Sequence, residues 1–158
     1  MSAVVKGGRI FLSYRREDAG HAGRLQDALN ERLGADHVVL DIEIRPGFNF
    51  VDTIRNQIAN ADVFIAMIGP RWLTAGDSDG RRRINQTDDF VRVELAEAIA
   101  AGTVVIPVLI GGAKMPAPSE LPTDIAGLAS FQPVELRETS WRQDAETLVE
   151  ALATARSA

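Results

Sequence analysis

The sequence predicts an α/β fold in which a five-stranded parallel sheet carries helices on both faces. Short apolar runs alternate with helical patterns along the 158 residues, which is typical of βαβ units. Hydrophobic residues make up 46% of the chain and charged residues 25%, a balance that suits one globular core. No repeat, low-complexity tract or linker interrupts the pattern. We therefore expect a single domain over residues 1–158, with its core from about residue 9 to 155.

Each expected element follows from its own pattern. Strands are expected at residues 9–13, 37–40, 61–69, 103–110 and 132–136, and helices at residues 22–33, 51–58, 89–100 and 141–155, with a short helical turn after residue 122. The run ADVFIAMIG at 61–69 is the most hydrophobic, so we expect it at the centre of the sheet. Pro107 predicts a bulge or a strand end within the fourth run, because proline lacks the N–H of a sheet ladder.

The helix boundaries have recognisable signals. The first helix repeats apolar residues at helical spacing: Ala22, Leu25, Leu29 and Leu33. Asp18 is available to cap its start, and Gly34 is placed to end it. Asn49 is expected to cap the second helix, whose apolar face consists of Val51, Ile54 and Ile58.

Composition excludes several functional classes. The 17 basic and 22 acidic residues give 17 − 22 = −5, which does not favour a nucleic-acid partner. The chain has no cysteine, hence no disulfide, thiolate metal site or cysteine nucleophile. Its two histidines, His21 and His37, lack carboxylates at metal-ligand spacing, so we expect no metal site. No apolar run is long enough for a signal peptide or a membrane span, and we expect a cytoplasmic protein.

Ligands of such sheets bind beyond the carboxyl ends of the strands, so the residues after each strand are the candidates. SYRREDAG follows the first strand, and its hydroxyl, aromatic ring and guanidinium groups suit a phosphate or a ribose. The chain has neither a GxGxxG motif after that strand nor a G-K-[ST] motif, which argues against dinucleotide-fold oxidoreductases and P-loop NTPases. A phospho-receiver domain would need acidic residues where Ser13 to Arg16 stand.

Two later loops allow two interpretations each. In DIEIRPGFNF, Pro46-Gly47 marks a tight turn, which is either a simple connection or, with Arg45 and its aromatic neighbours, a docking loop. After the third strand, Trp72 is either a stacking surface for a ligand ring or a core residue. The run Arg81-Arg82-Arg83 lies among aspartates and is interpreted as a solvated charge cluster.

The helix DFVRVELAEAIA carries a glutamate beside its apolar stripe. Val91, Leu95 and Ala98 form the buried face, and Glu94 falls about 60° to one side, next to Phe90. A carboxylate half sheltered by an aromatic ring and facing the strand ends would act strongly on a ligand cation. Glutamate is also a good helix former, so an ordinary surface role is the alternative.

Four stretches in order, FLSYRRED, DIEIRPG, IGPRW and DFVRVE, resemble those of a bacterial TIR domain, the Toll and interleukin receptor domain. The resemblance covers residues 9 to about 155 and implies a flavodoxin-like TIR fold. In that family the loop after the second strand, the BB loop, mediates assembly. Its enzymatic members cleave NAD+ between nicotinamide and ribose with a glutamate in a W-x-x-x-E motif. Here the motif is represented by Phe90 to Glu94, with phenylalanine in place of tryptophan.

The resemblance implies a role for each matching residue. Glu94 would be catalytic, while Ser13, Tyr14, Arg15, Arg16, Asp41, Arg45, Trp72 and Phe90 would bind substrate. The BB loop would be Ile44, Arg45, Pro46, Gly47 and Phe48. NAD+ would be the substrate and no cofactor or metal would be needed. The product would be ADP-ribose or a cyclic isomer, and geometry below the level of sequence decides between them.

The implied role is an effector of bacterial immunity or cell death that self-associates through TIR–TIR contacts and depends on a sensor domain in a longer native chain. Two alternatives use the same surfaces. One is a non-catalytic adaptor that only assembles with other TIR domains, and the other is a virulence factor that binds host TIR adaptors.

Overall fold

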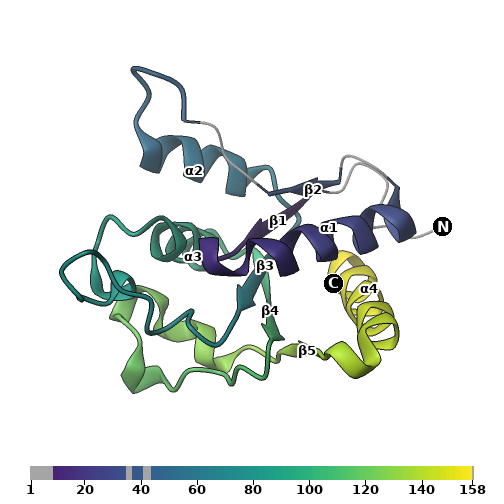
Figure 1. The fold of residues 1–158 in the computed structure, drawn as a ribbon. Coiled ribbons are helices and arrows are strands. Elements are labelled where there is room, and N and C mark those ends of the chain that lie inside the picture. The colour runs from purple at the N-terminus through teal and green to yellow at the C-terminus, as the bar shows by residue number, and fades with distance from the viewer. Residues whose placement is uncertain (1–8, 35–36, 41–43, 158) are drawn as a thin grey trace.

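A computed structural model describes residues 9–34, 37–40 and 44–157. Within these ranges five parallel strands form one sheet, in the order β2-β1-β3-β4-β5 (Figure 1). The strands are β1 (Ile10–Ser13), β2 (Val38–Val39), β3 (Val63–Ile68), β4 (Val104–Ile110) and β5 (Val134–Leu136). This is the flavodoxin-like order, and it confirms both the predicted fold class and the central place of the third strand.

Helices follow the strands as the sequence predicts. The α-helices are α1 (Ala19–Leu33), α2 (Phe50–Ala59), α3 (Phe90–Ala100) and α4 (Trp141–Ser157). The 3-10 helices are η1 (Arg16–Asp18), η2 (Arg83–Asn85), η3 (Pro118–Glu120), η4 (Thr123–Ser130) and η5 (Glu138–Ser140). The helical turn expected after residue 122 is η4. Among the described residues, no helix is both long and apolar enough to cross a membrane.

The sheet separates two apolar cores because successive strand side chains point to opposite faces. In β3, Val63, Ile65 and Met67 contribute to the core under α1 and α4, while Phe64 and Ile68 contribute to the core under α2 and α3. Figure 1 shows α4 on one side of the sheet and α2 and α3 on the other. The predicted apolar face of α1 lies entirely in the first core. Helices on both faces leave the strand ends as the place for a site.

Helix ends agree with the sequence at two of the three expected signals, those of Asn49 and Gly34. The Asn49 side chain accepts hydrogen bonds from the backbone N–H groups of Val51 and Asp52, which caps α2. Gly34 ends α1 with a φ of 91°, a conformation that favours glycine. The buried stripe of α3 is Val91, Leu95 and Ala98, as predicted.

Asp18 does not cap α1, although it precedes the helix. Its side chain makes no capping hydrogen bond and is buried over Gly69, at the end of β3. A Cβ atom at residue 69 would lie 2.4 Å from Asp18 Oδ2, so only glycine leaves room for this carboxyl group. Burial raises the pKa of Asp18 above its ordinary value. The sequence signal was wrong because tertiary packing removes the side chain from the helix start.

Pro107 marks neither a bulge nor the end of the fourth strand. It lies inside β4 opposite Ala66 of β3, and the register with β3 continues on both sides of it. A strand residue directs its N–H to one side only. On its other side β4 pairs with β5 only from Val108 onward, so before Val108 this side of β4 has no ladder partner within the described ranges. This local gap explains how the fold accepts a proline within the strand.

The start of α4 is held by a nearly buried carboxylate. Asp144 accepts hydrogen bonds from the backbone N–H, Nε and Nη2 of Arg137 and from the hydroxyl of Ser140. These bonds, those from the Arg137 side chain first, hold the pKa of Asp144 well below its usual range. The cluster ties the end of β5 to the first turn of α4.

We expect Asp144→Asn to lower the free energy of unfolding by about 1.5 to 3 kcal/mol at neutral pH. Arg137 is 58% exposed, so screening favours the lower value. Because the folded pKa of Asp144 is depressed, its contribution is present above the unfolded pKa and disappears as pH falls through the folded one. Urea unfolding between about pH 7 and about pH 3 measures this difference. Glu150→Gln, an exposed acid of the same helix, is the control, and an equal loss in both variants would contradict the assignment.

Candidate active site

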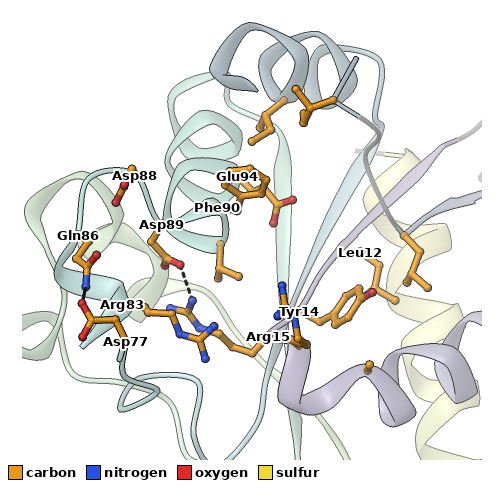
Figure 2. A pocket seen from close by; sticks show the side chains of 16 residues that line it. Leu12, Tyr14, Arg15, Asp77, Arg83, Gln86, Asp88, Asp89, Phe90 and Glu94 are labelled. Carbon is orange, nitrogen blue, oxygen red and sulfur yellow. Dashed lines mark hydrogen bonds and ion pairs between the residues drawn. The ribbon is translucent and has the colours of Figure 1, made fainter. Parts of the chain in front are cut away.

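A pocket of about 570 Å³ lies beyond the carboxyl end of β1. It is lined by side chains from segments far apart in the sequence (Figure 2). Tyr14, Arg15, Arg16 and Ala19 follow β1, Leu40 and Ile44 follow β2, and Asp77, Arg83, Gln86, Asp88 and Asp89 follow β3. Leu12, Ile54, Phe90, Val91 and Glu94 complete it from β1, α2 and α3. Its place and size are those of a ligand site in an open α/β sheet.

Glu94 presents a carboxylate to this pocket from the second turn of α3. The side chain is half-buried, and its Oε1 accepts a hydrogen bond of 2.9 Å from the hydroxyl of Ser13. Ser13 is itself buried, with 3% of its surface exposed. The hydroxyl at the end of β1 therefore fixes one carboxylate oxygen in a partly sheltered place, where a negative charge acts more strongly than in bulk water.

Phe90 forms an apolar wall next to this carboxylate. It lies one helical turn before Glu94, lines the pocket and is 50% exposed. Its ring stacks on that of Phe50, with centroids 4.8 Å apart and planes 18° from parallel. Phe50 begins α2, so the stack joins the helix after the BB loop to the helix that carries Glu94. An exposed ring face beside a carboxylate suits a flat cationic ligand group.

Arg15 and Asp89 form a buried ion pair in the wall of the pocket. Arg15 Nη1 donates to Asp89 Oδ1 at 2.6 Å, and the two side chains are 2% and 7% exposed. Asp89 Oδ2 accepts the backbone N–H of Arg92 and so caps α3. Arg15 Nε also donates to the carbonyl of Trp72. The residue after β1 thereby fixes the start of the helix that carries Glu94.

The structure brings most of the predicted site residues together. Tyr14, Arg15, Arg16, Ile44, Phe90 and Glu94 all line the pocket. Ser13 does not line it and lies behind Glu94 as its hydrogen-bond partner. Asp41 lies outside the described residues. Arg45 is exposed and is not part of the pocket wall.

Trp72 was the wrong choice for a stacking surface. The indole is 1% exposed, belongs to the core under α2 and α3, and does not line the pocket. The guanidinium carbon of Arg15 lies 5.9 Å from the ring centroid. With its surface covered, the ring cannot receive a ligand, so the core interpretation holds. Phe90 offers the exposed aromatic ring instead.

The BB loop contains the tight turn expected from its sequence. Phe48 N–H donates to Arg45 O at 3.1 Å, and Gly47 has a φ of 86°. Proline followed by a glycine of positive φ is the pattern of a type II turn. The Phe48 side chain at the end of this turn is 66% exposed, which is unusual for a large apolar residue.

The sequence interpretation missed the contribution of the loop after β3. Arg81 is 69% exposed and pairs with Asp77 and Asp79, as a solvated cluster should. Arg83, two residues later, lines the pocket and pairs with Glu17 at 2.5 Å. The available signal was its position after the central strand, whose carboxyl end lies beside that of β1. Among the described residues, no group of His, Asp and Glu is arranged to hold a metal ion.

The sequence profile described as "TIR domain" matches residues 10–152. The chain belongs to the TIR-domain family. Solved structures with the same fold include the TIR domains of the activated Roq1 resistosome that recognises the pathogen effector XopQ, at 13% identity and a TM-score of 0.63. That match covers 92% of this chain and 99% of the other.

Two further structures extend the comparison. A TIR-STING receptor from C. gigas, in complex with 2',3'-cGAMP, has 20% identity and a TM-score of 0.60, over 91% of this chain and 39% of the receptor. A CMP N-glycosidase from Clostridium botulinum, BcmB, has 16% identity and a TM-score of 0.50, over 90% and 98% of the two chains. At these identities the neighbours show the fold alone, while the profile match over residues 10–152 confirms the family that the four motifs indicated.

Breaking the buried pair should destabilise the TIR domain strongly. In Arg15→Gln, Asp89 keeps its charge without a cation, and we expect a loss of about 3 to 5 kcal/mol in the free energy of unfolding. Adding Asp89→Asn should recover part of this loss, since neither charge then remains buried. Denaturant unfolding measures both effects. Arg81→Gln, which breaks an exposed pair, is the control and should cost less than about 1 kcal/mol. Equal losses for the two arginine variants would contradict the role of the pair.

Proposed function

We propose that this TIR domain is an NAD+ nucleosidase that cleaves the bond between nicotinamide and ribose, with Glu94 as its catalytic carboxylate. One observation carries the proposal. The Glu94 carboxylate is half-buried, held by Ser13, and lines a pocket large enough for a nucleotide. Its position also matches the glutamate of the family's W-x-x-x-E motif. The CMP N-glycosidase from Clostridium botulinum gives the proposal indirect support, because its name describes N-glycosidic cleavage of a nucleotide.

The reaction needs little more than one well-placed anion. Nicotinamide leaves NAD+ as a neutral molecule, so its departure requires no general acid. The barrier lies in the positive charge that develops on the ribose as the bond to nicotinamide breaks. A fixed carboxylate stabilises that oxocarbenium character, as carboxylates do in glycosidases. The hydrogen bond from Ser13 to Oε1 holds the carboxylate in place for this role.

The other pocket residues fit the two ends of this substrate. The exposed ring of Phe90 gives the cationic nicotinamide an aromatic surface next to the carboxylate. Tyr14 and Arg16 extend the wall with a phenol and a guanidinium group that suit ribose hydroxyls and phosphates. Water attack on the cation gives ADP-ribose, and an internal attack gives a cyclic isomer.

Glu94→Gln should lower nicotinamide release from NAD+ by about 100- to 1000-fold, because the amide has the same shape but no charge. Glu97→Gln is the matched control, since Glu97 lies one turn later on α3, pairs with Arg55 and does not line the pocket. Release is measured by chromatography at high protein concentration, which also separates ADP-ribose from cyclic products. Full activity in a folded Glu94→Gln variant would exclude this residue as the catalytic group.

The proposed biological role is that of a cytoplasmic effector in bacterial immunity or cell death, switched on by self-association and, in a longer native chain, by a sensor domain. The exposed Phe48 on the BB-loop turn supports an assembly surface. Two neighbours support it by analogy, since one is the set of TIR domains of a resistosome and the other is a TIR-STING receptor. NAD+ and further TIR domains are the proposed partners.

Activity per molecule should therefore rise with protein concentration. We expect a several-fold increase in specific activity across a wide dilution series, and a smaller one in a variant with Arg45 and Pro46 replaced by alanine. Arg142→Gln, an exposed change on α4, is the control. A constant specific activity would contradict activation by assembly. If no NAD+ is cleaved while the domain still self-associates, the adaptor function replaces the enzymatic one.

A further inference from the structure

We propose that Arg83, together with Arg15, forms a binding site for the diphosphate group of the substrate, so that the pocket selects dinucleotides over nucleosides. This inference rests on the proposed function, because it concerns the same pocket. It assigns a specificity role to a residue that the sequence analysis interpreted as part of a solvated cluster.

The two guanidinium groups reach the pocket from different parts of the chain. Arg15 follows β1, and Arg83 begins η2 in the long loop after β3. Both line the pocket, and Figure 2 shows their side chains extending toward one another beneath Asp89. Arg15 is 2% exposed and Arg83 is 30% exposed. Arg15 is thus almost fully buried and Arg83 partly exposed, and each is paired with an acid, Arg15 with Asp89 and Arg83 with Glu17.

Each arginine has an unused donor. Arg15 uses Nη1 for Asp89 and Nε for Trp72, and Arg83 uses Nη2 for Glu17. Arg15 Nη2 and Arg83 Nε are buried, and neither has a hydrogen-bond partner among the described residues. A buried donor without a partner costs free energy unless a ligand accepts its hydrogen bond. Phosphate oxygens are the acceptors that guanidinium groups bind best.

The surrounding charge favours an anion at this end of the pocket. The charge of Arg71 also acts on Glu17, which is the partner of Arg83. The pKa of Glu17 is lowered first by a backbone hydrogen bond and then by the charges of Arg83, Arg71 and Arg15. One glutamate therefore lies within the field of three arginines. Arg16 is the third arginine that lines the pocket. Asp77, Asp88 and Asp89 line it as well, and of these Asp89 is paired with Arg15. Glu94 supplies negative charge from α3, so the same pocket offers separate places for a phosphate and for a developing cation.

Binding of ADP and adenosine tests the site without any catalysis. ADP carries the diphosphate, and adenosine lacks it. By calorimetry at constant ionic strength, we expect the 158-residue chain to bind ADP at least about tenfold more tightly than adenosine. Arg83→Gln should remove this preference and leave adenosine affinity unchanged. Arg83→Lys keeps the charge without the planar fork, should lose part of the preference, and replaces the glutamine variant if that one does not fold.

Two controls separate phosphate binding from structural effects. Arg81→Gln changes the same arginine run outside the pocket and should keep the preference for ADP. Glu17→Gln breaks the Arg83–Glu17 pair but keeps Arg83, so it should keep or increase ADP affinity. Equal binding of ADP and adenosine by the wild type would overturn the proposal. So would a loss of ADP binding in Glu17→Gln or Arg81→Gln as large as in Arg83→Gln.

A kinetic measurement tests the diphosphate site and the cleavage reaction separately. If nicotinamide release occurs but is as efficient from nicotinamide riboside as from NAD+, the diphosphate site is excluded and the nucleosidase function stands. If ADP binding depends on Arg83 while no nicotinamide is released, the diphosphate site stands and the reaction is excluded.

Discussion

The candidate site depends on the buried ion pair between Arg15 and Asp89. Arg15 follows the end of β1, and Asp89 caps α3, so one contact fixes the helix that carries Glu94 against the central part of the sheet. Two charges taken out of water are costly unless their remaining hydrogen-bonding groups are satisfied. Here the Arg92 N–H and the Trp72 carbonyl supply much of that compensation. The Ser13 hydroxyl then fixes the orientation of Glu94 from the same strand end.

The positions of polar groups beneath the pocket follow from the strand order. β1 and β3 are neighbours in the sheet, but the chain leaves them in loops of very different length, and both loops end at α-helices. Asp18, at the end of the first loop, meets Gly69, at the start of the second, and the close approach of the carboxyl group requires glycine at 69. Buried charge therefore concentrates at the topological switch point, where ligands of such sheets bind. Buried N–H donors at this place that have no hydrogen-bond partner among the described residues favour ligand binding at the expense of stability. This combination is common at functional sites.

Apolar surface is also exposed on this side of the domain. Phe48 and Phe90 are two of the three large hydrophobic side chains exposed among the described residues, and both lie near the Phe50 end of α2. The Phe50–Phe90 stack joins the BB-loop side of the domain to the helix that carries Glu94. A partner that contacts the BB loop would therefore act on a surface that also lines the pocket. This arrangement gives a physical route by which assembly and activity can be linked.

The sequence by itself determined the fold class, the order of elements and the side of the sheet that carries the site. Apolar periodicity fixed the buried faces of α1 and α3, and local signals fixed the Asn49 cap and the Pro46-Gly47 turn, because these features depend on near neighbours in the chain. It also placed Glu94 on the shoulder of its helix. The four motifs then named the family.

Only the tertiary structure decided which polar and aromatic residues reach the pocket. Trp72 is buried in the core, and Ser13 lies behind Glu94 as its hydrogen-bond partner. Asp18 does not cap the helix that it precedes. Arg83 lines the pocket from a loop 70 residues after Ser13 (83 − 13 = 70). Pro107 remains inside β4 because β5 pairs with only part of that strand. Each of these outcomes depends on which segment packs against the residue, and local sequence carries no information about a neighbour that is distant in the chain.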